Sequence, residues 1–113
     1  MKEIQAIIQP FKVNAVTDAL QGIPGVSGIT AFDVRGFGHQ RGQSGIERRA
    51  QGSVNYTKKV MLVLLVPDSV VDTVLSAIQR HAHTGNPGDG KIIVLPVQDA
   101  LRVRTGERGE DAL

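Results

Sequence analysis

The sequence predicts an α+β domain in which two helices cover one face of a four-stranded antiparallel sheet. Three observations predict this fold class. Four short apolar segments have the alternation or the length of strands, two segments repeat apolar residues at helical spacing, and one long glycine-rich segment separates the two halves. With 113 residues, 41% of them hydrophobic, the chain is long enough to bury one continuous core as a single domain over 1–113.

The first half of the chain has the pattern of strand, helix and strand. Residues 3–8 alternate between two faces, and Pro10 ends that strand. Apolar residues at helical spacing follow over 13–20, and a cluster of glycine and proline at 22–25 stops the helix. Alternation over 28–34 predicts the second strand.

The second half repeats this order. Residues 60–66 are a continuous, valine-rich apolar run, as expected of a central strand covered on both faces. Ser69 and Asp72 resemble a capping box that opens a helix. The predicted buried stripe of that helix is Val70, Val71, Val74, Leu75 and Ile78. A turn cluster at 85–90 and a strand over 92–97 complete the order β-α-β-loop-β-α-β, which is the double split βαβ of the ferredoxin-like fold.

One face of such a sheet has no helix to cover it. The strand at 60–66 has apolar positions on both sides, so we expect the uncovered face to pack on another subunit. The chain is therefore expected to form an oligomer.

The composition excludes several classes of site and location. There is no cysteine, which excludes disulfides, thiolate zinc sites, iron–sulfur clusters and thiol nucleophiles, and which suits a cytoplasmic protein. The longest apolar run, 60–66, is far shorter than the ~20 residues that span a bilayer. No apolar stretch follows the start of the chain at 1–5, so no signal peptide is expected.

Nucleic acid is not an expected partner. The aromatic residues are Phe11, Phe32, Phe37 and Tyr56, which are too few for base stacking. The strand at 60–66 has none, whereas an RNA-binding sheet of this fold carries aromatics on its central strands.

Residues 35–59 form a predicted long loop that is strongly basic. The stretch contains five glycines and has no apolar periodicity. Its basic residues are Arg35, Arg41, Arg48, Arg49, Lys58 and Lys59, against Glu47 alone. Such a loop is either a solvated linker or a recognition arm that orders around a ligand or docks into an acidic partner. His39 and Gln40 lie at its root, and the adjacent Gly36 and Gly38 allow close approach of the backbone to a ligand.

A second candidate site is the turn at 84–91, Thr-Gly-Asn-Pro-Gly-Asp-Gly-Lys. Successive backbone amides in a glycine turn form an anion-binding concavity, and Lys91 adds a positive charge for a phosphate. The turn is not a Walker A loop, because no Ser or Thr follows Lys91 and a strand comes next. The alternative is a hairpin-like turn that needs glycine for its backbone angles.

A third candidate site is the pair Arg102 and Arg104. In an extended segment, residues i and i+2 point to the same face, so both guanidinium groups can converge on one anion. Together with Lys91 they offer three cations to a polyphosphate. The alternative is that both arginines are solvated and balance an acidic tail. That tail contains Glu107, Glu110 and Asp111.

Two histidines complete the candidates. His81 and His83 are two residues apart near a helix end, so they do not share a helical face. We expect them to be polar residues of a helix terminus rather than metal ligands.

Several separate motifs, in the right order, match one family: the chain resembles the PII signal-transduction proteins over essentially all of its length. The matching segments are Ile-Ile-Gln-Pro-Phe-Lys at 7–12, Val-Arg-Gly-Phe-Gly-His-Gln-Arg-Gly at 34–42, Val-Pro-Asp at 66–68, the family's B-loop at 84–92 and its C-terminal loop at 102–107. The resemblance implies a homotrimer that binds ATP or ADP in clefts between subunits, often with Mg-ATP and 2-oxoglutarate. It also implies a regulator of nitrogen metabolism, not an enzyme, that docks a long T-loop (35–59) onto an ammonium channel, an enzyme or another regulator. The resemblance implies that the protein contacts a membrane only by binding a transporter such as that channel.

The resemblance further implies roles for individual residues. The nucleotide site would consist of Thr30, Gly36, Gly38, His39, Gly88, Asp89, Gly90, Lys91, Arg102 and Arg104, with both arginines coming from the neighbouring subunit as part of the C-terminal loop and tail (102–113). Gln40 matches the family's magnesium-linked glutamine, and Gln40 with Lys59 would bind 2-oxoglutarate. Arg41, Arg48 and Arg49 of the T-loop would contact the protein target.

Some positions depart from the family pattern. Gly52 stands where enteric relatives carry a uridylylated tyrosine, so that modification is not expected. His39 replaces the usual arginine, which leaves the preference among ATP, ADP and AMP open and introduces a titratable group. The loop over 43–57 matches the usual channel-binding loop poorly, which leaves a PII-like regulator of bicarbonate or metal transport as the alternative. Slow nucleotide hydrolysis is disfavoured, because Asp89 is the only acid in the phosphate motifs and a glycine turn is a poor place to fix it.

Overall fold

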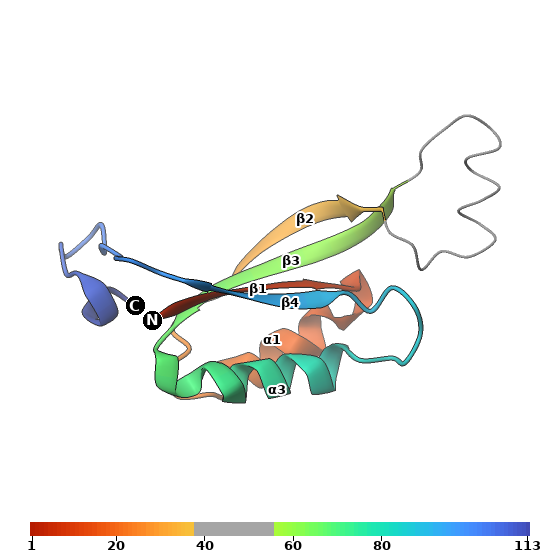
Figure 1. The fold of residues 1–113 in the computed structure, drawn as a ribbon, viewed down its shortest axis with the longest axis horizontal. Helices are drawn as coiled ribbons and strands as arrows, with labels where there is room; N and C mark the ends of the chain where they lie inside the picture. The colour runs from red at the N-terminus through yellow and green to blue at the C-terminus, as the bar shows by residue number, and fades with distance from the viewer. Residues whose placement is uncertain (38–55) are drawn as a thin grey trace.

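The computed structural model describes residues 1–37 and 56–113. Within these residues the elements follow the order strand, helix, strand, strand, helix, strand (Figure 1). The strands are β1 (Lys2–Ile8), β2 (Thr30–Gly36), β3 (Thr57–Val66) and β4 (Lys91–Pro96), and the α-helices are α1 (Val13–Gln21) and α3 (Val71–Ala82). Short 3-10 helices occupy Pro10–Lys12, Asp68–Val70 and Gly109–Ala112.

The strands form one antiparallel sheet in the order β2-β3-β1-β4. β1 lies inside the sheet, where Ile4 is opposite Leu64 of β3 on one side and Val94 of β4 on the other. Both helices lie on the same side of the sheet (Figure 1). The predicted ferredoxin-like fold is therefore confirmed.

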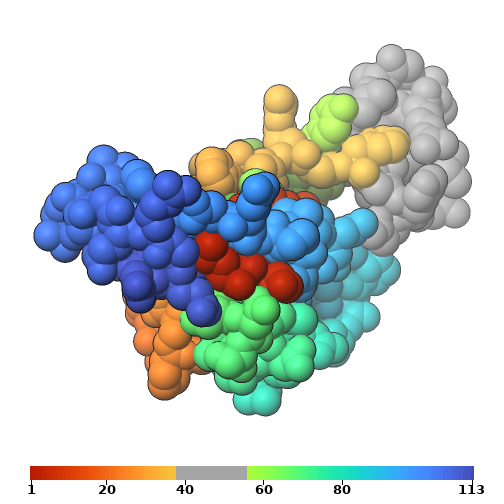
Figure 2. All heavy atoms as spheres, turned by 60° about the vertical axis from the view of Figure 1, so that its left-hand side comes forward, coloured from red at the N-terminus to blue at the C-terminus, as the bar shows by residue number. Residues whose placement is uncertain are grey.

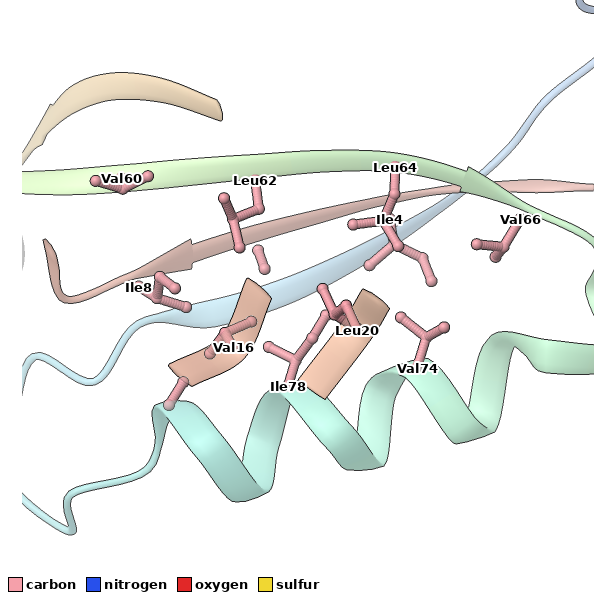
Figure 3. Close-up of a cluster of buried hydrophobic side chains, with 12 residues drawn as sticks. Ile4, Ile8, Val16, Leu20, Val60, Leu62, Leu64, Val66, Val74 and Ile78 are labelled. Carbon is pink, nitrogen blue, oxygen red and sulfur yellow. The ribbon is translucent and has the colours of Figure 1, made fainter. Parts of the chain in front are cut away.

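The hydrophobic core fills the space between the sheet and the two helices (Figure 3). Alternate residues of the central strands face the helices, because side chains of a strand point to opposite faces in turn. The buried residues are Ile4, Ala6, Ile8, Val16, Leu20, Val60, Leu62, Leu64, Val66, Val74, Ile78 and Ala82. Full burial of one such valine, leucine or isoleucine side chain contributes about 1.5–3 kcal/mol to folding.

No helix of the described residues covers the other face of the sheet. The β3 side chains on that face, Met61, Val63 and Leu65, are half-buried, and Phe32 of β2 is 47% exposed. The two-sided apolar pattern of the strand is thus confirmed, and this face presents apolar surface. Within the described ranges, no helix is long and apolar enough to cross a membrane.

The boundaries predicted for the basic loop are wrong at both ends. β2 continues to Gly36 and β3 begins at Thr57, so the two strands pair beyond the predicted limits, with Arg35 opposite Lys58. Charged side chains do not prevent this pairing, because they stay in solvent while the backbone forms the ladder. The loop proper is therefore shorter than 35–59, and its residues 38–55 lie outside the described part of the chain.

The predicted capping box of the second helix is also wrong. A 3-10 turn over Asp68–Val70 precedes α3, and no side chain caps either element. Asp68 instead accepts hydrogen bonds from the amino groups of Met1 and Lys2, at 2.9 and 3.3 Å, and the first of these lowers its pKa most. In the predicted stripe, Val74 and Ile78 are buried, whereas Val70, Val71 and Leu75 pack at the margin of the core.

Candidate functional site

The B-loop, residues 84–91, connects α3 to β4 and is built on glycine. Gly85, Gly88 and Gly90 have φ angles of 88°, 95° and 95°, a region that side chains strongly disfavour. At Gly90 a Cβ atom would lie 1.7 Å from the carbonyl oxygen of Ile7, so no side chain fits there without movement of the backbone. Glycine is therefore needed in this turn for its backbone conformation and, at Gly90, for space.

Asp89 closes the B-loop with its own side chain. One carboxylate oxygen accepts a hydrogen bond from the Thr84 hydroxyl at 2.5 Å, and the other accepts from the N–H groups of Thr84 and Gly85 at 2.8 and 2.9 Å. The Thr84 hydroxyl is the main reason that the pKa of Asp89 is lowered to about 2. The expectation that a glycine turn is a poor place to fix Asp89 is wrong, because the turn itself supplies the donors.

A pocket of about 510 Å³ lies where the B-loop meets the ends of β2 and β3. Its lining residues are Ile7, Gln9, Gly36, Phe37, Thr57, Lys59, Pro87, Gly88, Gly90, Lys91 and Ile93. Lys59 of β3 reaches across this pocket and donates a hydrogen bond to the carbonyl oxygen of Gly88. Burial lowers the pKa of Lys59, and the nearby charge of Asp89 opposes this effect. The structure therefore brings together five predicted residues, Gly36, Lys59, Gly88, Gly90 and Lys91, which we call the B-loop half-site.

The C-terminal arm, residues 98–113, continues from β4 away from the sheet (Figure 1). Its end returns to the start of the chain, so that the blue and red residues lie side by side in Figure 2. Leu101 and Arg108 form an antiparallel bridge, and the Gly106 N–H donates to the Arg102 carbonyl at 2.8 Å. The chain thus reverses between Arg102 and Glu107, because Gly106 adopts a φ of 76°.

This turn changes the prediction for the two arginines. The extended geometry that would place Arg102 and Arg104 on one face is wrong, because residues 103–105 form the turn. Arg102 pairs with Glu107 at 3.3 Å, as the alternative of a balanced acidic tail predicts. Arg104 is exposed and forms no ion pair with a described residue.

Thr30, Arg102 and Arg104 do not line the pocket of the B-loop half-site. Thr30, at the start of β2, lines a separate pocket of about 310 Å³ that includes the last two residues of the chain. The B-loop precedes β4 and the arm follows it, so the two lie at opposite ends of that strand (Figure 1). An extended strand of six residues is about 20 Å long. We call Thr30, Arg102 and Arg104 the arm half-site.

Comparison with known proteins places the chain in a family. The family model described as "Nitrogen regulatory protein P-II" matches residues 1–107. The protein of that name from Haemophilus influenzae is 48% identical, that from Azospirillum brasilense 46%, and "Nitrogen regulatory protein P-II 1" from Escherichia coli 44%, each over 113 residues that cover the whole of both chains. This chain belongs to the P-II family. Membership supports signal transduction in nitrogen metabolism as the class of function, and the relatives are named as regulatory proteins.

Several residues to which the P-II pattern gives a role lie outside the described residues. They are Gly38, His39 and Gln40 at the root of the T-loop, and Arg41, Arg48 and Arg49 further along it. Where the described residues meet the loop, the rings of Phe37 and Tyr56 lie edge to face, with their centres 6.2 Å apart. The guanidinium carbon of Arg35 lies 5.7 Å from the centre of the Tyr56 ring. Of these three residues, Phe37 also lines the pocket.

Sequence reasoning missed part of the pocket lining. Ile7, Gln9 and Ile93 line it although none was singled out as a site residue. The signal was strand alternation, because Ile7 and Gln9 are two residues apart and Ile7 is opposite Lys91 in the sheet.

His81 and His83 lie at and just after the end of α3. The Nδ1 atom of His81 lies 2.8 Å from the carbonyl oxygen of Ala77, one turn earlier in α3. No cluster of three or more His, Cys, Asp or Glu side chains occurs among residues 1–37 and 56–113.

Proposed function

We propose that this protein is a trimeric, adenine-nucleotide-sensing regulator of nitrogen metabolism. It binds ATP or ADP between neighbouring subunits and docks its T-loop onto a transporter, an enzyme or another regulator. The observation that carries the proposal is the separation of the predicted phosphate-binding groups of the B-loop from Arg102 and Arg104 of the arm, which lie at opposite ends of β4 (Figure 1). A head-to-tail ring of identical subunits joins the B-loop of one chain to the arm of the next, which completes the site.

The uncovered face of the sheet supports the assembly. Met61, Val63 and Leu65 form an apolar row on it, and burial of such a row provides the driving force for association. Sedimentation at micromolar concentration should give three times the chain mass of 12.1 kDa. A monomer would contradict both the assembly and the shared site.

The composition of the B-loop half-site supports the proposal that its ligand is an anion. This half-site places the amino groups of Lys59 and Lys91 beside a turn with three left-handed glycines, and a lysine supplies a point charge for phosphate or carboxylate. Lys59 is the group proposed to pair with 2-oxoglutarate. Mg²⁺ would enter with ATP and would be held by the phosphates and by Gln40, and it would keep several of its waters.

The function is tested by calorimetric titration of ATP, ADP and AMP, each with and without 2-oxoglutarate or bicarbonate. Arg104→Ala should weaken ATP binding by about 30-fold or more, because loss of one partner of a buried charged hydrogen bond costs ~2–5 kcal/mol. Arg80→Ala is the matched control, since it removes the same charge from the outer surface of α3 and should change affinity by less than about threefold. Wild-type affinity in Arg104→Ala would contradict the arm half-site.

Regulation, not hydrolysis, is the proposed activity. A hydrolase would need a carboxylate free to orient water, whereas the Asp89 carboxylate is engaged by three donors of its own loop. The cytoplasm is the proposed location, where a cysteine-free chain is compatible with reducing conditions.

A further inference from the structure

Glu107 engages one terminal nitrogen (Nη1) of the Arg102 guanidinium group, and the other (Nη2) donates a hydrogen bond to the carbonyl oxygen of Leu113 at 2.5 Å. The Glu107 carboxylate accepts hydrogen bonds from Arg102 at 3.3 Å and from the Thr105 hydroxyl at 2.8 Å. The backbone holds this contact in place, since the Arg102 N–H donates to the Glu107 carbonyl at 2.9 Å. The arm therefore carries its own anion beside Arg102.

The two arginines of the arm differ in this respect. Arg102 is paired with Glu107 and partly shielded, whereas Arg104 is exposed and has no carboxylate partner among the described residues. A phosphate that binds Arg104 finds a free cation, but a phosphate that binds Arg102 must displace or share a carboxylate. Both side chains of the Arg102–Glu107 pair remain partly in solvent, at 37% and 46% exposure, so the pair can open without a change in the fold.

We propose that Glu107 is an internal competitor for Arg102 that lowers the affinity of the site for nucleotides and favours ligands with more phosphate charge. The inference rests on the proposed function. A triphosphate carries enough negative charge to replace the carboxylate at Arg102, whereas a monophosphate reaches fewer cations and gains less from the exchange. Glu107 is thus a residue that sets affinity and specificity without being a ligand of the nucleotide.

The test compares wild type with Glu107→Gln, which keeps the size of the side chain and removes its charge. Calorimetric titration should show ATP binding tightened by about two- to fivefold, the range expected for release of an exposed ion pair. The gain should be smaller for AMP, and it should shrink as the NaCl concentration rises, because salt screens such pairs. Thermal unfolding is recorded for each protein to verify that the fold is unchanged.

Glu110→Gln is the matched control. It removes the same charge from the same arm, but Glu110 forms no ion pair with a described residue. An equal gain in this variant would show that net charge alone is responsible and would overturn the inference. Weaker ATP binding in Glu107→Gln would also overturn it, because Glu107 would then position Arg102 for the ligand.

The two proposals fail in different ways. If wild type binds ATP and Glu107→Gln binds it with the same affinity, only the competitor role of Glu107 is overturned. If neither protein binds ATP, ADP or inorganic tripolyphosphate, the nucleotide-sensing function and the role of Glu107 are both overturned.

Discussion

The B-loop and the C-terminal arm each contain a glycine turn in which a carboxylate accepts hydrogen bonds. The two carboxylates differ in whether their donors are neutral or charged. In the B-loop, Asp89 accepts hydrogen bonds from one hydroxyl and two backbone N–H groups, all of them neutral. In the arm, Glu107 accepts from a hydroxyl and from the guanidinium group of Arg102. Asp89 therefore stabilises the B-loop without a positively charged partner, whereas Glu107 stabilises the turn of the arm by pairing with Arg102.

This difference decides which positive charges are available to a ligand. Lys91 forms no ion pair with any residue the structure describes, so its charge remains for an anion in the pocket. Arg102 has a partner before any ligand arrives. The number of basic residues near a glycine turn therefore overestimates how many cations are free to bind phosphate. Cations that already pair with a neighbouring carboxylate have to be subtracted.

The largest expected effect is a difference in stability between alanine substitutions in the two turns, because only the B-loop turn is tightly packed. Gly90→Ala should destabilise the protein by at least ~3 kcal/mol, because the new Cβ would overlap the carbonyl oxygen of Ile7 and the residue has a positive φ. Gly106→Ala should cost only ~1–2 kcal/mol, since it has a positive φ but no atom within 4 Å of the new Cβ. Denaturant unfolding measures both.

Equal losses of stability in the two variants would show that backbone strain alone governs both turns. If Gly90→Ala does not fold well enough for denaturant unfolding, Gly88→Ala provides a second comparison. Its Cβ would approach the flexible ends of Gln9 and Lys59, at 3.2 and 3.3 Å, so the loss should lie between the other two.

An intermediate effect concerns Asp89 and depends on pH. Folding lowers the pKa of this carboxyl from 3.8 to about 2, so the charged form stabilises the folded state. This contribution is fully present above the unfolded value of 3.8 and is lost as the pH falls through about 2. The stability difference between wild type and Asp89→Asn, from unfolding at a series of pH values, should disappear over that window. A difference that does not change with pH would contradict the role assigned to the charge.

The smallest expected effect concerns the second ion pair of the arm, between Asp99 and Arg108. Asp99→Asn should leave the midpoint of thermal unfolding unchanged within error, because exposed ion pairs contribute little to stability. Amide exchange should accelerate at Gly109, whose N–H donates to the Ala100 carbonyl at 2.9 Å beside this pair. A lower midpoint would mean that the arm is part of the cooperative fold, as the B-loop is.

The fold was predictable from local patterns, and the errors have local causes. The alternation at Ile4, Ala6 and Ile8 identified the face that packs on the helices, and these residues are buried. The start of α3 was not predictable, because Asp68 pairs with the amino groups of Met1 and Lys2, which the capping pattern does not consider. The end of β2 was missed because strand pairing overrides the low strand propensity of a charged, glycine-rich segment.

The sequence by itself determined the order of the elements, the apolar stripes of the core and the glycine turn of the B-loop, because periodicity and turn chemistry act over a few residues. Only the tertiary structure decided how the basic residues of the candidate site are used. Lys59 reaches Gly88, which is 29 residues away in the chain, and the strand β4 keeps the B-loop apart from Arg102 and Arg104. Contacts of this kind depend on which strands pair and on which donors a carboxylate meets first, and a linear pattern of residues does not contain that information.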